Sequence, residues 1–284
     1  MYDDSEQVMN DIKTHTWVFT SVDIELYTSD LKDYWNEYGV QQWLKPRNFT
    51  VRIPDDIVDI SDLAFAHSYA LSSVIFPNGL KEIGYEAFTH CYRLTTVDLR
   101  NTQLMTIYEN AFYECRSLES VLFPDSLKTV GVEAFKKCNS LSSVTFPNSL
   151  TIIEKEAFQE CVSLSSVTFP NSLTTIGADV FHMCKRLGSV DLSRTKLSII
   201  SEGAFSLCFE LRSILFPNCL TTIGKEAFSK CRSLNNVTFP ESLTTIEEQA
   251  FEECTNLTNL TWNSNSQTTI EINAFRGCPL NLLY

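Results

Sequence analysis

Apolar and polar positions along residues 48–278 follow one pattern that repeats about ten times. Its consensus is C-x-x-L-x-x-V-x-F-P-x-x-L-x-x-I-x-x-x-A-F-x-x-C. One phenylalanine marks each copy and follows the previous one after 23 or 24 residues: Phe65, Phe88, Phe112, Phe135, Phe158, Phe181, Phe205, Phe228, Phe251 and Phe275. A fixed period in this range predicts a solenoid, in which each repeat packs only on its neighbours.

The first half of a repeat predicts a strand and a turn. In the copy at 164–184, Val167 and Phe169 alternate with a polar residue, so both apolar side chains should face inward from a strand. Pro170 cannot donate a backbone hydrogen bond, and it should therefore end the strand and begin a turn.

The second half should return apolar groups to the interior at Leu173 and Ile176. We expect Gly177 to allow a positive φ at the next corner, followed by a short helical or 3₁₀ turn over 178–184. A single repeat buries too little apolar surface to offset its ordering entropy, so repeats must stack. With parallel strands ~4.8 Å apart, ten repeats would form a rod or arc about 45–50 Å long.

Two copies depart from the consensus in the same way. LTTVDLRNTQLMTI (94–107) and LGSVDLSRTKLSII (187–200) lack the Phe-Pro pair and carry one extra residue. They lie 93 residues apart, which is four repeats, and the next copies also match, with VLFP and ILFP. We infer that a four-repeat block was duplicated; chance similarity among related repeats is the alternative.

The ends of the array are atypical, as expected for repeats that face water on one side. The first copy has Ser68 at the cysteine position, and the last, at 260–275, loses the Phe-Pro pair. Residues 1–47 precede the array; a strand is expected within 16–27, and short helices at 5–13 and from 29 onward. This segment also contains three of the four tryptophans: Trp17, Trp35 and Trp43.

We therefore divide the chain into an N-terminal capping segment, 1–47, and a solenoid, 48–284. A separate binding module at 1–47 is the alternative.

The charge and hydropathy of the chain limit the kinds of partner that it can bind and the cellular location that we expect. The net charge of −13 argues against nucleic acid as a partner and disfavours anionic membrane surfaces. The N-terminus has acids where a signal peptide needs bases, and no run of about 18 apolar residues occurs. These features predict a cytoplasmic protein without membrane insertion.

The consensus L-x-x-V-x-F-P-x-x-L-x-x-I-G-x-x-A-F-x-x-C resembles the BspA-type leucine-rich repeat, over about 230 of the 284 residues. The resemblance implies a leucine-rich-repeat solenoid with a parallel sheet on the concave face and short helical or 3₁₀ turns on the convex side. Members of this class are mostly described as cell-surface adhesins or antigens that bind host or matrix proteins. The resemblance thus implies a protein partner and leaves a cell-surface location open.

Nine of the ten cysteines share one repeat position: Cys91, Cys115, Cys138, Cys161, Cys184, Cys208, Cys231, Cys254 and Cys278. Neighbours in such a ladder point the same way, so we expect buried thiols rather than disulfides. Together with the phenylalanines they should form a structural ladder. Cys219 stands off it, either as a reactive thiol or as a tolerated replacement of serine.

Sites for chemistry are weakly indicated. His67 and His90, 23 residues apart, should stack on adjacent repeats, either as a two-His metal clip or simply as two exposed residues. No C-x-x-C pair, Ser-His-Asp order, phosphate loop or carboxylate pair stands out, so we expect neither a cofactor nor an enzyme.

The strands supply the candidate binding face. Their central outward positions, one per repeat, are Arg52, Ile75, Asp98, Leu122, Thr145, Thr168, Asp191, Leu215, Thr238 and Thr261. A Ser/Thr-rich row runs beside them. The apolar members are either contact residues or ordinary strand formers. Two functions follow: a non-catalytic recognition or adhesion module that uses this face, or an intracellular scaffold embedded in a larger assembly.

Overall fold

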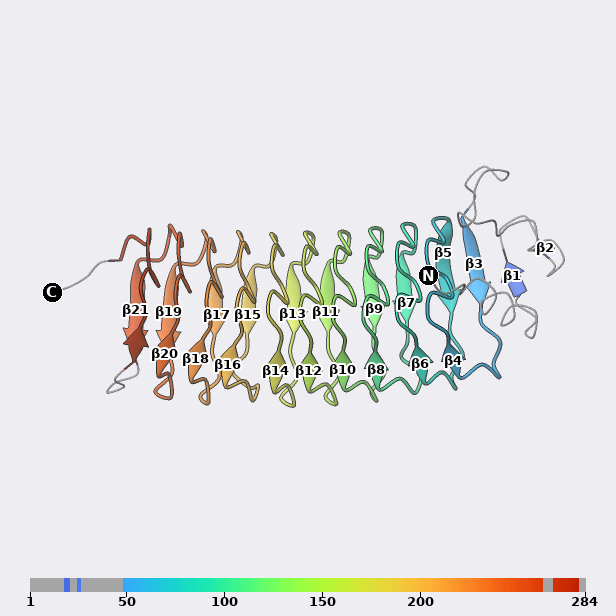
Figure 1. Ribbon diagram of the computed structural model, residues 1–284, viewed down its shortest axis with the longest axis horizontal. Helices are drawn as coiled ribbons and strands as arrows, with labels where there is room; N and C mark the ends of the chain where they lie inside the picture. Colours follow the sequence, from blue (N-terminus) through green and yellow to red (C-terminus); the bar gives the residue numbers. More distant parts are fainter. Residues whose placement is uncertain (1–17, 21–24, 27–47, 263–267, 281–284) are drawn as a thin grey trace, which may run out of the picture.

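The computed structural model describes residues 18–20, 25–26, 48–262 and 268–280. From residue 48 the chain winds into a stack of rungs, each with one longer and one shorter strand (Figure 1). The longer strands are β3 (Phe49–Arg52), β5 (Leu71–Ile75), β7 (Thr96–Asp98), β9 (Ser120–Leu122), β11 (Ser143–Thr145), β13 (Ser166–Thr168), β15 (Ser189–Asp191), β17 (Ser213–Leu215), β19 (Asn236–Phe239) and β21 (Asn259–Trp262).

The shorter strands form a second column that the sequence pattern did not predict. They are β4 (Asp59–Ile60), β6 (Glu82–Ile83), β8 (Thr106–Ile107), β10 (Thr129–Val130), β12 (Ile152–Ile153), β14 (Thr175–Ile176), β16 (Ile199–Ile200), β18 (Thr222–Ile223), β20 (Thr245–Ile246) and β22 (Thr269–Ile270). Each contributes one inward isoleucine or valine and one outward residue. A rung is therefore closed by two ladders on different sides of the core.

Both columns pair in parallel and join equivalent positions of successive rungs, in separate sheets that each span two to four rungs. In the long-strand column Val144 pairs with Val167 and Thr145 with Thr168, and in the short-strand column Ile153 pairs with Ile176. A shift by one residue would turn these inward side chains to the solvent, which is why the register is strongly specified. The predicted leucine-rich-repeat solenoid is thus confirmed. Because the stack follows a nearly straight axis in Figure 1, we name the outer surface of the longer strands the long-strand face.

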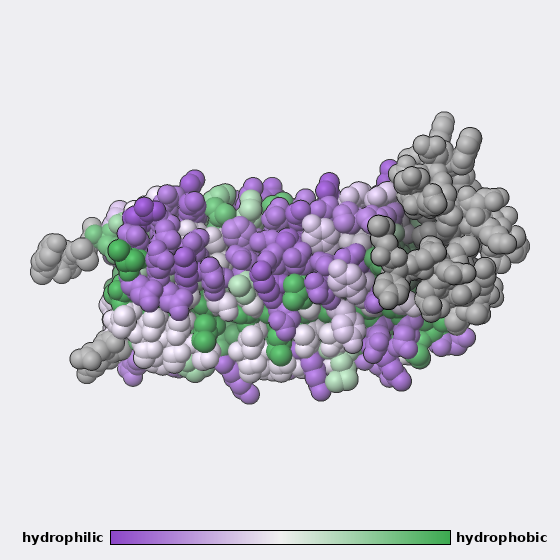
Figure 2. All heavy atoms as spheres, in the orientation of Figure 1, coloured by the Kyte–Doolittle hydropathy of each residue, from purple (hydrophilic) through white to green (hydrophobic). Residues whose placement is uncertain are grey.

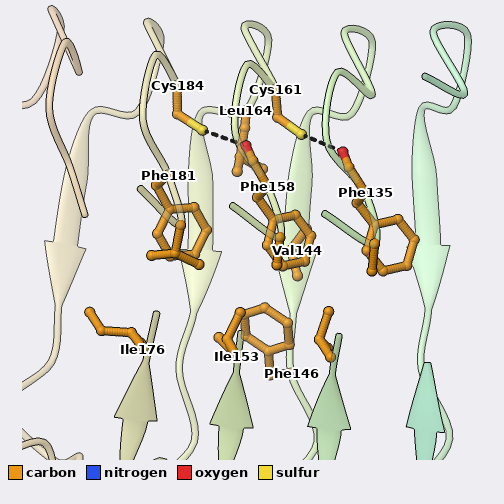
Figure 3. Close-up of a cluster of buried hydrophobic side chains, with 14 of the residues drawn as sticks. Phe135, Val144, Phe146, Ile153, Phe158, Cys161, Leu164, Ile176, Phe181 and Cys184 are labelled. Carbon is orange, nitrogen blue, oxygen red and sulfur yellow. Dashed lines mark hydrogen bonds between the residues drawn. The ribbon is translucent and has the colours of Figure 1, made fainter. Parts of the chain in front are cut away.

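The core repeats one aromatic arrangement along the rod. Phe158 stacks on Phe135 (ring centroids 5.3 Å apart) and on Phe181 (5.6 Å) (Figure 3). Phe146, from the Phe-Pro pair, meets the Phe158 ring edge to face at 5.6 Å. Such stacked and T-shaped pairs suit the quadrupole of the ring and add to the benefit of burial. The predicted phenylalanine ladder is therefore continuous from rung to rung.

The expected short helical or 3₁₀ turns were wrong, since the described residues form no helix. Glu86 and His90 have φ of 53° and 60°, and every rung repeats this pair of left-handed positions. Around these positions every second backbone amide donates a hydrogen bond to a carbonyl of the next rung. Phe88 N donates to Ala111 O, and His90 N donates to Tyr113 O, both at 2.8 Å. A helix needs negative φ and bonds within the segment, so bonding between rungs replaces helix with successive turns.

Gly177 also behaves differently from expectation. Among the described glycines only Gly203 and Gly277 have positive φ. A Cβ on Gly177 would lie 2.2 Å from the backbone nitrogen of Lys155, on the preceding rung. The glycine is required because the two rungs approach closely there, not because the corner needs a left-handed conformation.

At the N-terminal end of the stack, β1 (Val18–Thr20) pairs antiparallel with β3 and with β2 (Glu25–Leu26). Both strands fall within the segment 16–27, where a strand was expected. The expected helices and the three tryptophans of the segment 1–47 lie outside the described residues. The capping role of this segment stays a prediction.

Candidate functional site

The long-strand face brings the ten predicted positions into one row. Each inward valine, such as the 2% exposed Val144, is flanked by outward neighbours such as Thr145. All ten side chains of the row are exposed, and the strand register places them side by side in five pairs of neighbouring rungs. The exposed row predicted for this face is therefore present, and its role in binding stays a prediction.

Two carboxylates interrupt this row of mainly hydroxyl-bearing side chains. Asp98 accepts hydrogen bonds from Nε (3.0 Å) and Nη2 (2.7 Å) of Arg100, which lowers the pKa of the Asp98 carboxyl. Asp191 accepts bonds from the hydroxyl (2.6 Å) and backbone nitrogen (2.9 Å) of Ser193, and these bonds lower its pKa too. Both groups are ionised at neutral pH. Asp98 is balanced by its arginine, whereas the Ser193 bonds to Asp191 carry no positive charge.

Three exposed aliphatic side chains stand in the same row. Ile75, Leu122 and Leu215 are 44%, 41% and 55% exposed. Leu122 pairs with Asp98, and Leu215 pairs with Asp191, so the two rungs that lack the Phe-Pro pair each begin the same aspartate–leucine step. A large aliphatic group beside a charge, amid small hydroxyl side chains, is suited to contact with another protein.

The cysteine ladder lies inside the stack. Cys161 Sγ donates to Phe135 O (3.2 Å), and Cys184 Sγ donates to Phe158 O (3.3 Å), each on the preceding rung (Figure 3). All nine ladder cysteines make the equivalent bond. Burial raises the pKa of the Cys161 thiol, so the thiolate that would react is disfavoured. The eight fully buried thiols of the ladder therefore connect rungs and offer no nucleophile.

Cys219 takes the place of a serine. In other rungs a turn serine donates to a leucine carbonyl of the preceding rung, as Ser149 does to Leu127 O at 2.6 Å. Cys219 Sγ donates to the equivalent carbonyl, Leu197 O, at 3.3 Å. The geometry favours the interpretation of a serine replacement, while the exposed sulfur remains accessible to reagents.

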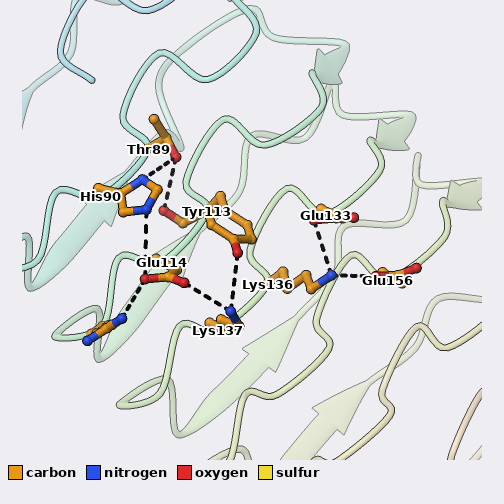
Figure 4. Close-up of polar contacts among 9 residues, drawn as sticks. Thr89, His90, Tyr113, Glu114, Glu133, Lys136, Lys137 and Glu156 are labelled. Atoms are coloured by element: carbon orange, nitrogen blue, oxygen red, sulfur yellow. Dashed lines mark hydrogen bonds and ion pairs between the residues drawn. The ribbon is translucent and has the colours of Figure 1, made fainter. Parts of the chain in front are cut away.

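A buried carboxylate organises the turns of the first rungs (Figure 4). Glu114, 6% exposed, holds Arg116 Nη2 at 2.6 Å and Lys137 Nζ at 3.0 Å. Burial alone would raise the pKa of Glu114, but the bonds from Lys137 and Arg116 outweigh it and lower the pKa. His90 Nε2 lies 3.8 Å from the same carboxylate. Sequence reasoning missed this network because its members sit on three successive rungs and are far apart in the sequence.

The two histidines stack, as their spacing predicted, with ring centroids 4.7 Å apart. The Nδ1 atom of His67 faces the hydroxyl of Tyr69 (3.3 Å), and that of His90 faces the hydroxyl of Thr89 (3.0 Å). Ring nitrogens bind metals in the ring plane, and near-parallel rings do not aim theirs at one point. Within the described ranges, no group of three or more His, Cys, Asp or Glu is placed to hold a metal.

Family comparison agrees with the geometry. The family model for the BspA type leucine rich repeat region matches residues 47–164, 105–217 and 151–281, which together span the whole array. The chain belongs to the BspA-type leucine-rich repeat family. No curated protein gives a significant match.

The chain matches several solved bacterial leucine-rich repeat structures. A leucine-rich repeat protein from Eubacterium ventriosum is 18% identical, with a TM-score of 0.51 over 81% of this chain and 82% of that one. A Bacteroides ovatus leucine-rich repeat protein is 26% identical, with a TM-score of 0.43 over 81% and 76% of the two chains. The T. pallidum leucine-rich repeat protein is 27% identical, with a TM-score of 0.48 over 69% and 81%. The Eubacterium ventriosum structure shows a shared fold.

In the part of the chain that the structure describes, no helix could span a lipid bilayer.

Proposed function

We propose that the protein is a non-catalytic, protein-binding solenoid and that the long-strand face is its recognition surface. The observation that carries the proposal is the row of ten exposed, rung-aligned side chains, which presents aliphatic and acidic groups against a background of hydroxyls. Extended faces of this kind are what solenoids use to bind partners. The exposed carboxylate of Asp191 beside Leu215 favours a partner with a basic side chain next to an apolar one.

The experiment is photo-crosslinking in an extract of the source cells. Leu215 is replaced by a photo-reactive phenylalanine analogue, and adducts are identified by mass spectrometry. The matched control carries the same analogue at Ile199, on the short-strand column, because Ile199 and Leu215 are exposed to similar degrees, 50% and 55%. A defined protein adduct from position 215 and none from 199 supports the proposal. Adducts from 199 alone, or from neither position, would overturn it.

An intracellular scaffold is the second candidate function. Its support is the cysteine ladder, whose thiols donate to backbone carbonyls of the preceding rung and not to one another, since cysteine-rich extracellular domains usually form disulfides. The adhesin alternative rests on family membership. Antibody staining of intact and permeabilised source cells separates the two: staining of intact cells supports the adhesin, and staining only after permeabilisation supports the scaffold.

A further inference from the structure

Two rungs of the long-strand face, those of β7 and β15, share a local structure that sets them apart from the rungs with a Phe-Pro pair. In both, an inward leucine replaces the phenylalanine, and Leu99 and Leu192 are fully buried. A buried threonine then closes the loop: Thr102 Oγ1 donates to Leu99 O, and Thr195 Oγ1 donates to Leu192 O, both at 2.8 Å. The backbone nitrogen of each threonine donates to the same carbonyl at 2.9 Å. Two loops of different sequence are thus held in the same way.

The same two rungs each hold a carboxylate outward by the same kind of bond. Asp98 Oδ1 accepts a hydrogen bond from the backbone nitrogen of Arg100 at 3.2 Å, and Asp191 Oδ1 accepts one from that of Ser193 at 2.9 Å. Such a bond from the residue two positions on fixes the rotamer of an aspartate. Both carboxylates are therefore oriented before anything binds, and a partner does not have to order them.

An exposed leucine follows each carboxylate on the next rung, Leu122 beside Asp98 and Leu215 beside Asp191. The two aspartate–leucine steps lie four rungs apart. Phenylalanine rings stack at every rung between them, with centroids 5.2–5.6 Å apart, so the stack is unbroken from one step to the other. Because parallel strands are ~4.8 Å apart, the two steps are separated by about 19 Å along one face.

The charges of these carboxylates are satisfied to different degrees. Hydrophilic residues gather along the middle of the rod (Figure 2), and on its turns acids meet bases, as Lys136 Nζ does Glu133 at 3.2 Å. Among the described residues Asp191 is hydrogen-bonded by neutral groups only, whereas Asp98 is paired with Arg100. A cation of a partner therefore meets an unpaired charge at Asp191 and competes with an arginine at Asp98.

On the basis of the function proposed for this face, we propose that the two aspartate–leucine steps bind one partner protein at the same time. That partner repeats one element, a basic side chain next to an aliphatic one, about 19 Å apart. The basic group meets the carboxylate and the aliphatic group meets the leucine. One step alone offers far less contact area than a stable interface needs. Binding at the second step is intramolecular, so the two steps together hold a repeating partner far more tightly than either step does alone.

The test places the photo-reactive phenylalanine analogue at position 122, at position 215, or at both in the full chain, and irradiates each variant in an extract of the source cells. Both single positions should capture the same protein, and the double variant should join one partner molecule at two points. Asp191→Asn should lower capture at position 122 at least about tenfold, because the distant contact is lost. Glu241→Gln removes an exposed carboxylate from a turn after β19 and should leave capture at position 122 unchanged.

The outcomes separate this proposal from the proposed function. Capture at neither position overturns both. Capture at 215 alone, different proteins at the two positions, two partner molecules on the double variant, or undiminished capture at 122 in Asp191→Asn overturns binding at two steps and leaves the face as a recognition surface. Thermal unfolding of each variant checks the fold, and Asp191→Ser serves as a second variant should the asparagine disturb the loop.

Discussion

Removing the Phe158 ring measures how strongly the rungs hold one another. The ring is fully buried, stacked between Phe135 at 5.3 Å and Phe181 at 5.6 Å, with Phe146 edge-on at 5.6 Å. Truncating a buried phenylalanine to alanine costs about 3–5 kcal/mol, from lost transfer free energy and from the cavity that remains. Three aromatic contacts are lost here, each about 0.5–1.5 kcal/mol beyond burial, so we expect the upper part of that range.

The assay is chemical denaturation followed by far-ultraviolet circular dichroism. Phe275→Ala is the matched control, since Phe275 is partly exposed on the last rung and stacks on Phe251 at 5.2 Å from one side. We expect it to cost less than half as much as Phe158→Ala. Because repeats couple to their neighbours, the Phe158→Ala defect should weaken the middle of the rod and broaden or split the transition. An unchanged transition for Phe158→Ala, or an equal loss for Phe275→Ala, would refute the stacking argument.

Three further changes test other parts of the structure. Gly177→Ala should lower the free energy of unfolding by about 2 kcal/mol or more, because the new Cβ would lie 2.2 Å from a backbone atom. The control Gly188→Ala, whose nearest contact is at 4.0 Å, should be close to neutral. Similar melting temperatures of the two variants would contradict the close approach at Gly177. Burial and the neighbouring His67 lower the pKa of His90, so the imidazole binds a proton more tightly in the unfolded chain than in the folded one. The contribution of neutral His90 to the free energy of unfolding is therefore complete above about pH 6.5 and is lost as the pH falls below this value. His90→Gln should show a smaller loss of melting temperature between about pH 7.5 and 5.5, and an identical loss would remove His90 from the account. Finally, a thiol reagent should label the exposed Cys219 and the partly exposed Cys278 of the folded protein first, and the eight fully buried ladder cysteines only after unfolding. Cys219→Ser should remove one thiol from the fast phase. Fast labelling of more than one thiol per chain in Cys219→Ser would show that the ladder opens.

Much of the fold could be read from the repeat because a solenoid stacks like on like. A fixed spacing leaves one register in which every inward valine, phenylalanine and cysteine meets its counterpart, and Val144 opposite Val167 is one instance of many. The same reasoning placed the candidate binding residues: an outward position in one strand must lie beside the outward position of the next. The period thus determined the ladder, the core and the row of exposed side chains.

The backbone conformation of the turns, in contrast, is determined by contacts between neighbouring rungs. The residues at the left-handed positions include glutamates, a methionine and leucines, such as Glu86, Met183 and Leu207, none of which signals positive φ locally. Their conformation is imposed by amides that bond the neighbouring rung, so a helical turn was the reasonable but wrong expectation. Gly177 is similar, because the backbone that excludes a side chain there belongs to Lys155, on the preceding rung.

By itself, then, the sequence determined the solenoid, its register and the residues on each side of its strands, since these depend on spacing within the chain. Only the tertiary structure decided how Glu114 gathers charges from several rungs and where one rung approaches another so closely that only glycine fits, as at Gly177. These features depend on what lies next to a rung in space. A repeat reads almost the same whether another rung covers it or water does.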